Sequence, residues 1–207
     1  MNRNNIFLRI VNKILRHSMI NSIPMLDKCL FLTFDDGPEP GITEFVLDEL
    51  AKYNFKATFF CRGDNVEKYP ELLNRIKKDG HAIGNHTYSH VHSFNCNFKE
   101  YCADVDKADR VLNTPLFRPP HGSHTLLTFL RLKKRYKSYF WALNSDDSAM
   151  NRFDYYKSID MLKNHTKVGD IVLFHFCHKH EKETRVLLPE YLKWLSNNGL
   201  RSQSITN

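Results

Sequence analysis

The 207-residue sequence has no long uninterrupted apolar run, no glycine-rich phosphate loop and no paired cysteines. Because no run approaches the length of a transmembrane helix, the apolar residues are expected to form a core. The absence of GxGxxG and GxxxxGKS/T patterns counts against a nucleotide-binding open sheet. The five cysteines are an odd number without a CxxC pair. This pattern favours ordinary thiols in a reducing compartment over a disulfide framework. Cys29, Cys61 and Cys102 lie in apolar strand or helix patterns and are expected to be core thiols.

The charge balance is basic but not concentrated. Lys and Arg outnumber Asp and Glu by 30 to 23, for a net charge of +7. Such an excess fits nucleic acid, an anionic glycan, an acidic membrane surface or a soluble basic surface. The basic clusters are short, and the sequence has no basic helix or aromatic platform of the kind that nucleic-acid binding needs. We therefore expect no nucleic-acid partner.

Residues 1–28 form an amphipathic N-terminal segment, and residues 29–207 are expected to form one catalytic domain. The segment starts basic, as a secretory signal does, but Arg9, Lys13 and Arg16 interrupt the apolar stretch that a signal needs. A cytoplasmic location is therefore predicted. The apolar residues recur at helical spacing, which favours a helix packed on the domain over membrane contact through residues 1–20.

The rest of the chain alternates short apolar runs with longer segments of helical period. The predicted strands are 30–34, 57–60, 82–85, 116–118, 138–143, 171–176 and 200–204. The predicted helices are 42–53, 70–79, 98–112, 124–136, 155–165 and 184–198. This alternation indicates parallel strands joined by right-handed crossovers. Because the chain is shorter than the usual ~250-residue eightfold barrel, we predict an α/β fold: a distorted, incomplete (β/α) barrel with about seven parallel strands.

Polar residues follow the predicted strands, at the ends where ligands bind in parallel α/β folds. Five separate segments are expected to converge on one face of the domain. They are Asp35-Asp36-Gly37, "NHTYSH" at 85–90, "RPPHG" at 118–122, "NSDD" at 144–147, and His175.

Two of these segments together suggest a metal site. His86 and His90 are four residues apart, so one helical turn would aim both imidazoles the same way. Thr87 stands where a zinc protease has its Glu base, so the base must come from elsewhere. Asp35 and Asp36 supply a third ligand and a base, although an isolated Asp-Asp-Gly is more often a strand-ending turn. The other polar strand ends favour the metal site.

Two further residues have alternative interpretations. Arg118 follows an apolar strand and precedes two prolines that stiffen its loop, as holding a carboxylate requires. A surface cation would fit the same position. His175 lies inside "IVLFHF", where a core histidine with satisfied hydrogen bonds is the alternative to a catalytic one.

Together the five segments resemble the polysaccharide deacetylase family, carbohydrate esterases that include chitooligosaccharide, chitin and peptidoglycan deacetylases. "TFDDGP", "HTYSH", "RPPHG", "WALNSDD" and "LFH" look like the five motifs of that family, in order, from about Cys29 to the C-terminus. The resemblance implies the family's distorted (β/α) barrel. It also implies metal-dependent removal of an acetyl group from an N-acetylated sugar or polysaccharide. This carbohydrate substrate is the expected binding partner.

The resemblance further implies a role for each matching residue. Asp35 would be the base, and Asp36, His86 and His90 would bind one divalent transition metal, with zinc expected. Arg118 would hold Asp35, and Asp147 would hold His175, the acid. His121, through its backbone N–H, and Leu173 would contact the substrate.

Three positions depart from the family pattern. His121 replaces the usual Tyr, Ser148 stands where an aromatic residue is common, and Phe176 stands where Asp is frequent. Ser148 leaves room for an alternative, a glycan-binding pseudoenzyme that keeps the metal site. Release of acetate distinguishes an enzyme from that alternative.

Overall fold

The computed structural model describes residues 20–206. The strands are β1 (Cys29–Asp35), β2 (Ala57–Cys61), β3 (Ala82–Asn85), β4 (Leu116–Phe117), β5 (Lys137–Ser138), β6 (Leu143–Asn144), β7 (Ile171–His175) and β8 (Arg201–Ser202). The α-helices are α2 (Ile42–Ala51), α3 (Gly63–Lys68), α4 (Pro70–Lys78), α5 (Phe98–Leu112), α6 (Leu126–Leu132), α7 (Tyr155–His165) and α8 (Glu181–Asn197). Three short 3₁₀ turns are η1 (Pro120–Gly122), η2 (Met150–Arg152) and η3 (His178–His180).

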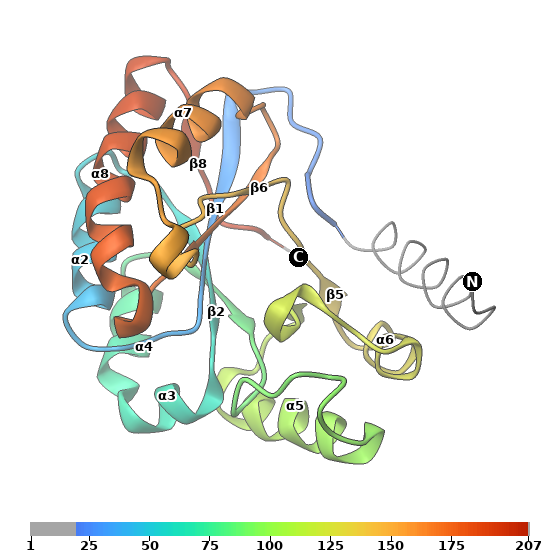
Figure 1. Ribbon diagram of the computed structural model, residues 1–207. Helices are drawn as coiled ribbons and strands as arrows, with labels where there is room; N and C mark the ends of the chain where they lie inside the picture. Colours follow the sequence, from blue (N-terminus) through green and yellow to red (C-terminus); the bar gives the residue numbers. More distant parts are fainter. Residues whose placement is uncertain (1–19, 207) are drawn as a thin grey trace.

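The strands form one parallel sheet in the order β5-β4-β3-β2-β1-β7-β6, and β8 pairs with the start of β1. The sheet curls, and helices cover its outer side (Figure 1). Successive helices touch around that side in the order α7, α8, α2, α4, α3, α5, α6. The prediction of an incomplete barrel with about seven parallel strands is confirmed.

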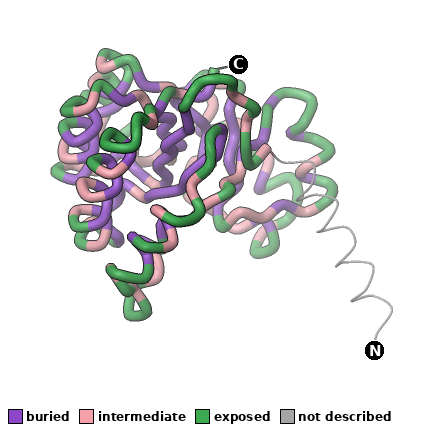
Figure 2. The backbone as a smooth tube through the Cα atoms, turned by 90° about the horizontal axis from the view of Figure 1, so that it is seen from above, coloured by how far each residue is buried: buried purple, intermediate pink, exposed green. Residues whose placement is uncertain are grey.

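β1 is buried over its whole length because both faces of the sheet are covered. Its side chains alternate between the two faces, as in any strand. Leu30, Leu32 and Phe34 pack in the large cluster between the sheet and the helices, whereas Phe31 joins a smaller cluster inside the curl. Figure 2 shows the buried chain concentrated in this interior. By the same alternation Asp35 faces the inside of the curl.

The predicted strand 138–143 was wrong, because two strands lie there. β5 pairs with β4 at one edge of the sheet, and β6 pairs with β7 at the other. Residues 139–142 cross between these edges, since the Tyr139 N–H donates to the Phe117 carbonyl and the Ala142 N–H donates to the Ile171 carbonyl. The prediction of extended, apolar chain was correct, but its two ends pair with different strands, β4 and β7, at opposite edges of the sheet.

The helix signals were mostly accurate. Pro70 occupies the first turn of α4, and Gly199 follows α8 with a φ of 68°. α8 passes through Pro189 without ending. α6 is shorter than the predicted 124–136, because Thr125 caps its start by accepting a hydrogen bond from the Thr128 N–H. The six-residue α3 was not predicted, since it is too short to show a helical period.

Most of the predicted N-terminal segment lies outside the described residues. The described part of it contacts the domain, because Ile20 forms a bridge with Tyr139 and Ser22 forms one with Asp170. Within residues 20–206, no helix combines the length and the apolar composition needed to cross a membrane.

Candidate active site

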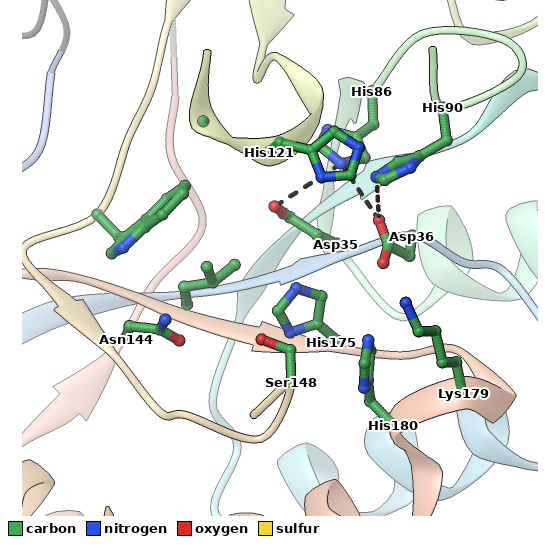
Figure 3. Close-up of a pocket in the computed structure, with 13 residues that line it drawn as sticks. Asp35, Asp36, His86, His90, His121, Asn144, Ser148, His175, Lys179 and His180 are labelled. Atoms are coloured by element: carbon green, nitrogen blue, oxygen red, sulfur yellow. Dashed lines mark ion pairs between the residues drawn. The ribbon is translucent and has the colours of Figure 1, made fainter. Parts of the chain in front are cut away.

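A pocket lies at the carboxyl ends of the strands, where the sequence placed the site (Figure 3). Seven of the nine residues that the sequence assigned to the site line it: Asp35, Asp36, His86, His90, His121, Leu173 and His175. Arg118 and Asp147 are fully buried behind this lining and contact two of the seven. The structure therefore brings together all nine residues.

Asp35 and Asp36 separate at the end of β1 for a backbone reason. Asp35 is the last residue of the strand, and Asp36 has a φ of 83°, in the left-handed region. The alternation of side chains along a strand does not separate the two carboxylates, because Asp36 lies beyond the strand; the left-handed turn separates them. Asp36 Oδ1 lies 3.2 Å from His86 Nε2 and 3.0 Å from His90 Nε2. Asp35 Oδ2 lies 3.9 Å from His86 Nε2.

His86 and His90 do not share a helical turn, so that part of the prediction was wrong. The segment is a loop in which Thr87 and His90 have φ values of 64° and 59°. Its amides bind side chains instead of one another, because the Tyr88 and Ser89 N–H groups both donate to Asp104 Oδ1, at 2.8 and 3.1 Å. The loop nevertheless aims both imidazoles at Asp36.

These three ligand groups fit a metal cation. His86 Nδ1 lies 2.8 Å from the Arg118 carbonyl, which only accepts, so Nδ1 carries the proton. In the neutral ring, Nε2 then turns a lone pair toward Asp36 Oδ1, an arrangement that needs a cation between the two atoms. Asp36 Oδ1 is buried and accepts no hydrogen bond from the described residues. The ligand atoms of Asp36, His86 and His90 all lie within 4.8 Å of one another.

Asp36 is ionised at neutral pH. Burial alone would raise the pKa of this carboxyl, but when no metal is bound and the His86 and His90 imidazoles are protonated, they hold the pKa well below its usual value. A carboxylate with two imidazoles is a donor set of the kind that binds zinc and related divalent ions.

Arg118 holds Asp35 from inside the curl. Its Nη1 donates to Asp35 Oδ1 at 2.7 Å and to Thr33 Oγ1 at 2.9 Å. Nε and Nη2 donate to the carbonyls of Tyr139 and Phe140, in the segment that crosses between the sheet edges. This fully buried guanidinium is therefore paired and hydrogen-bonded, as a buried charge must be. The surface-cation alternative is excluded.

His175 is bound by a buried carboxylate. Its Nδ1 lies 2.7 Å from Asp147 Oδ1, and its backbone N–H donates to Asp147 Oδ2 at 2.7 Å. Thr184 Oγ1 also donates to Asp147 Oδ2. Burial alone would lower the pKa of His175, but the Asp147 charge raises it to about 9. The imidazole is therefore a proton donor at neutral pH.

The two residues that the resemblance assigned to substrate contact, His121 and Leu173, both line the pocket. His121 is in η1 with a φ of 57°, and its ring centroid is 4.7 Å from that of His90. Leu173 lines the pocket from β7. Sequence reasoning did not single out four further lining residues, which are Trp141, Asn144, Lys179 and His180. Trp141 and Asn144 lie inside the quoted fourth motif, so a signal for their segment existed.

The family model described as polysaccharide deacetylase matches residues 22–138, more than half of the chain. The chain is 31% identical over 190 residues to a peptidoglycan-N-acetylglucosamine deacetylase of Bacillus cereus, covering 89% of each. It is 30% identical over 187 residues to the peptidoglycan-N-acetylmuramic acid deacetylase PdaC of Bacillus subtilis, covering 86% of this chain and 38% of PdaC.

The fold likewise matches solved structures. The crystal structure of a peptidoglycan N-acetylglucosamine deacetylase in complex with 4-naphthalen-1-yl-N-oxidanyl-benzamide has a TM-score of 0.83 and 28% identity, and the match covers 93% of this chain and 92% of that one. The curled parallel sheet, the pocket and these matches agree: the chain belongs to the polysaccharide deacetylase family. Deacetylation of a polysaccharide is the function that this membership supports.

Proposed function

We propose that this protein is a metal-dependent deacetylase that hydrolyses the acetamide of an N-acetylated sugar in peptidoglycan or a related glycan. The metal part of the proposal rests on His86 and His90, whose imidazoles converge on a buried oxygen of Asp36. That oxygen accepts no hydrogen bond from the described residues. The similarity to the Bacillus cereus deacetylase over 89% of both chains supports the substrate class.

Asp36, His86 and His90 would hold one divalent transition metal, with zinc expected from the donor set. When bound, the ion polarises the acetamide carbonyl and lowers the pKa of a water molecule toward neutrality. All three donors come from loops that follow β1 and β3, which leaves the pocket side of the site open to substrate.

Asp35 acts as the general base. Its Oδ1 accepts from Arg118 Nη1, so Oδ2, which faces the pocket, receives the proton of the attacking water. Because the guanidinium is buried with this carboxylate, Arg118 pairs with its charge and fixes its orientation. Arg118 is thus a positioning residue.

His175 acts as the general acid. Asp147 binds its Nδ1, so Nε2 is free to donate the proton to the amine nitrogen as the C–N bond breaks. The new C–O bond comes from the water, and the products are acetate and the free amino sugar. The backbone N–H of His121 is the expected donor to the acetamide oxygen in this scheme.

Acetate release tests the proposal. The full chain is incubated with a peptidoglycan fragment, a chitooligosaccharide and an O-acetylated sugar, before and after chelation and after zinc is restored. We expect zinc-dependent acetate release from an N-acetylated glycan, and release roughly 10²–10⁴-fold slower by Asp35→Asn. Glycan binding without release would instead support the pseudoenzyme alternative. Activity that survives complete metal removal would contradict the metal mechanism.

A further inference from the structure

Cys177 and His180 form a cluster beside the candidate active site that the mechanism does not use. Cys177 lies two residues after β7, His180 is the last residue of η3, and they are 5% and 4% exposed. Their ligand atoms lie within 4.8 Å of each other and of a carboxylate oxygen of Asp36. His180 also lines the pocket (Figure 3).

His180 carries an unpaired polar atom. Its Nδ1 is buried and has no hydrogen-bond partner among the described residues. A buried polar atom without a partner destabilises the folded chain. A cation bound by this ring would supply a polar partner that the described residues do not provide.

The spacing between Asp36 and Cys177 suits shared ligation of one ion. Asp36 Oδ2 lies 3.9 Å from Cys177 Sγ. Two ligands on a tetrahedral zinc ion, with bonds of 2.0–2.3 Å, are about 3.6 Å apart. The two atoms therefore already lie close to ligand separation. Thiolate, imidazole and carboxylate together form a donor set that zinc and cobalt accept.

We propose that Asp36, Cys177 and His180 form a second transition-metal site, which binds a thiophilic divalent ion such as zinc. The proposal rests on the proposed function only through Asp36, whose Oδ1 faces His86 and His90 while Oδ2 faces Cys177. A carboxylate in this position would hold one ion through each oxygen, as carboxylates do in known two-metal sites. On binding, the Cys177 S–H bond breaks, the proton passes to solvent, and the sulfur bonds to the ion.

Cobalt(II) is the probe, because a cobalt–thiolate bond gives a near-ultraviolet charge-transfer band and ligation by nitrogen and oxygen alone does not. The metal-free full chain is titrated with Co²⁺, and bound cobalt is counted by equilibrium dialysis. We expect two ions per chain at saturation, together with a thiolate band. Cys177→Ser should lose the band and one of the two ions.

Cys29→Ser is the matched control, because Cys29 is also 5% exposed but lies at the opposite end of β1. It should keep both ions and the band. His180→Gln is a second variant in case Cys177→Ser does not fold, and it should weaken the second ion and the band together.

The site is wrong if wild-type protein shows no thiolate band at saturation, or if the band survives Cys177→Ser. The proposal would also be overturned if wild-type protein bound one cobalt ion per chain and Cys177→Ser lost the thiolate band. Cys177 would then be a ligand of the only ion, and there would be no second site. Failure of the proposed function is separately visible, because His86→Ala and His90→Ala would leave the cobalt count at its wild-type value.

Discussion

At the scale of single residues, Asp35 and Asp36 show how neighbours in sequence acquire different chemistry. Asp35 contacts a buried guanidinium, whereas Asp36 contacts two imidazole nitrogens. The left-handed backbone at Asp36 places its carboxylate outside the strand register. The two like charges are thereby separated, and each has a positive or polar partner of its own.

Replacing Asp35 tests the division of labour between these carboxylates. Asp35→Asn keeps the shape and one acceptor oxygen for Arg118, so the protein should retain its metal while the deacetylation rate falls roughly 10²–10⁴-fold, the scale of general-base catalysis. Asp36→Ala should lose metal and rate together. Metal content and acetate release are measured on the same samples. Loss of metal from Asp35→Asn would make Asp35 a ligand and move the base elsewhere.

The pH profile tests the pair formed by His175 and Asp147. Since the acid must be protonated, kcat/KM should fall as pH rises through the pKa of His175, which Asp147 raises to about 9 and a nearby bound cation lowers. Asp147→Asn removes the negative charge, so the alkaline limb should move to lower pH. His175→Ala should retain metal and lose this limb. An alkaline limb at the same pH in Asp147→Asn would exclude His175 as its origin.

At the scale of elements, the loop after β3 is held by a side chain of α5. Asp104 accepts from the Tyr88 and Ser89 N–H groups and, at 2.8 Å, from Ser89 Oγ. These three bonds fix a loop that ends at His90. The geometry of the proposed metal site therefore depends on a helix that contributes no ligand.

Removing this support should weaken metal binding without removing a ligand. Asp104→Ala leaves the loop amides without their acceptor, and we expect zinc affinity to fall about 10–100-fold, the usual cost of losing an outer-shell partner. Asp106→Ala, on the same helix, is the control, because within residues 20–206 Asp106 pairs only with the exposed Arg135. Zinc affinity is measured by competition with a chelator. Equal affinities for the two variants would mean that Asp104 does not position the site.

The cysteines also belong to this scale, since each takes its environment from its element. We expected Cys29, Cys61 and Cys102 to be core thiols, and Cys29 in β1 and Cys61 in β2 are buried. Cys102 is only partly buried, because its position on α5 lies at the edge of the packed face. The sequence assigned no role to Cys177, which is buried beside the pocket and enters the second metal site proposed above.

At the scale of the whole molecule, the proposed metal joins loops that follow two separate strands, β1 and β3. An ion that binds only the folded state stabilises that state by mass action. With free zinc at 1,000 times its dissociation constant, the gain is about 4 kcal/mol. For a chain of this length, we expect the Tm to fall by roughly 10 °C on chelation.

Differential scanning calorimetry checks this expectation. His86→Ala and His90→Ala are the controls, and their Tm should not respond to zinc added at the concentration that saturates only the first site. A wild-type Tm that is the same with and without chelator would argue against a metal bound specifically by the folded chain. The cytoplasmic location, the membrane contact through residues 1–20 and the absence of a nucleic-acid partner remain predictions.

The sequence by itself determined the fold class and which residues gather at the candidate active site. Alternating apolar runs and helical periods specify parallel strands, because those patterns arise from local burial. The polar residues at strand ends could be placed together, since parallel strands deliver their carboxyl ends to one side of a sheet. Asp35, His86 and Arg118 were therefore predictable as neighbours while still far apart in the chain.

Only the tertiary structure decided how those residues meet. The left-handed turns at Asp36 and His90 depend on contacts with distant segments, as does the division of 138–143 between two sheet edges. Thr184, which donates to Asp147, and His180, whose Nδ1 is unpaired, gain their roles from packing between α8 and the strands. Local patterns report which side chains are buried, but pairing between remote groups is set by three-dimensional distance, which no local period encodes.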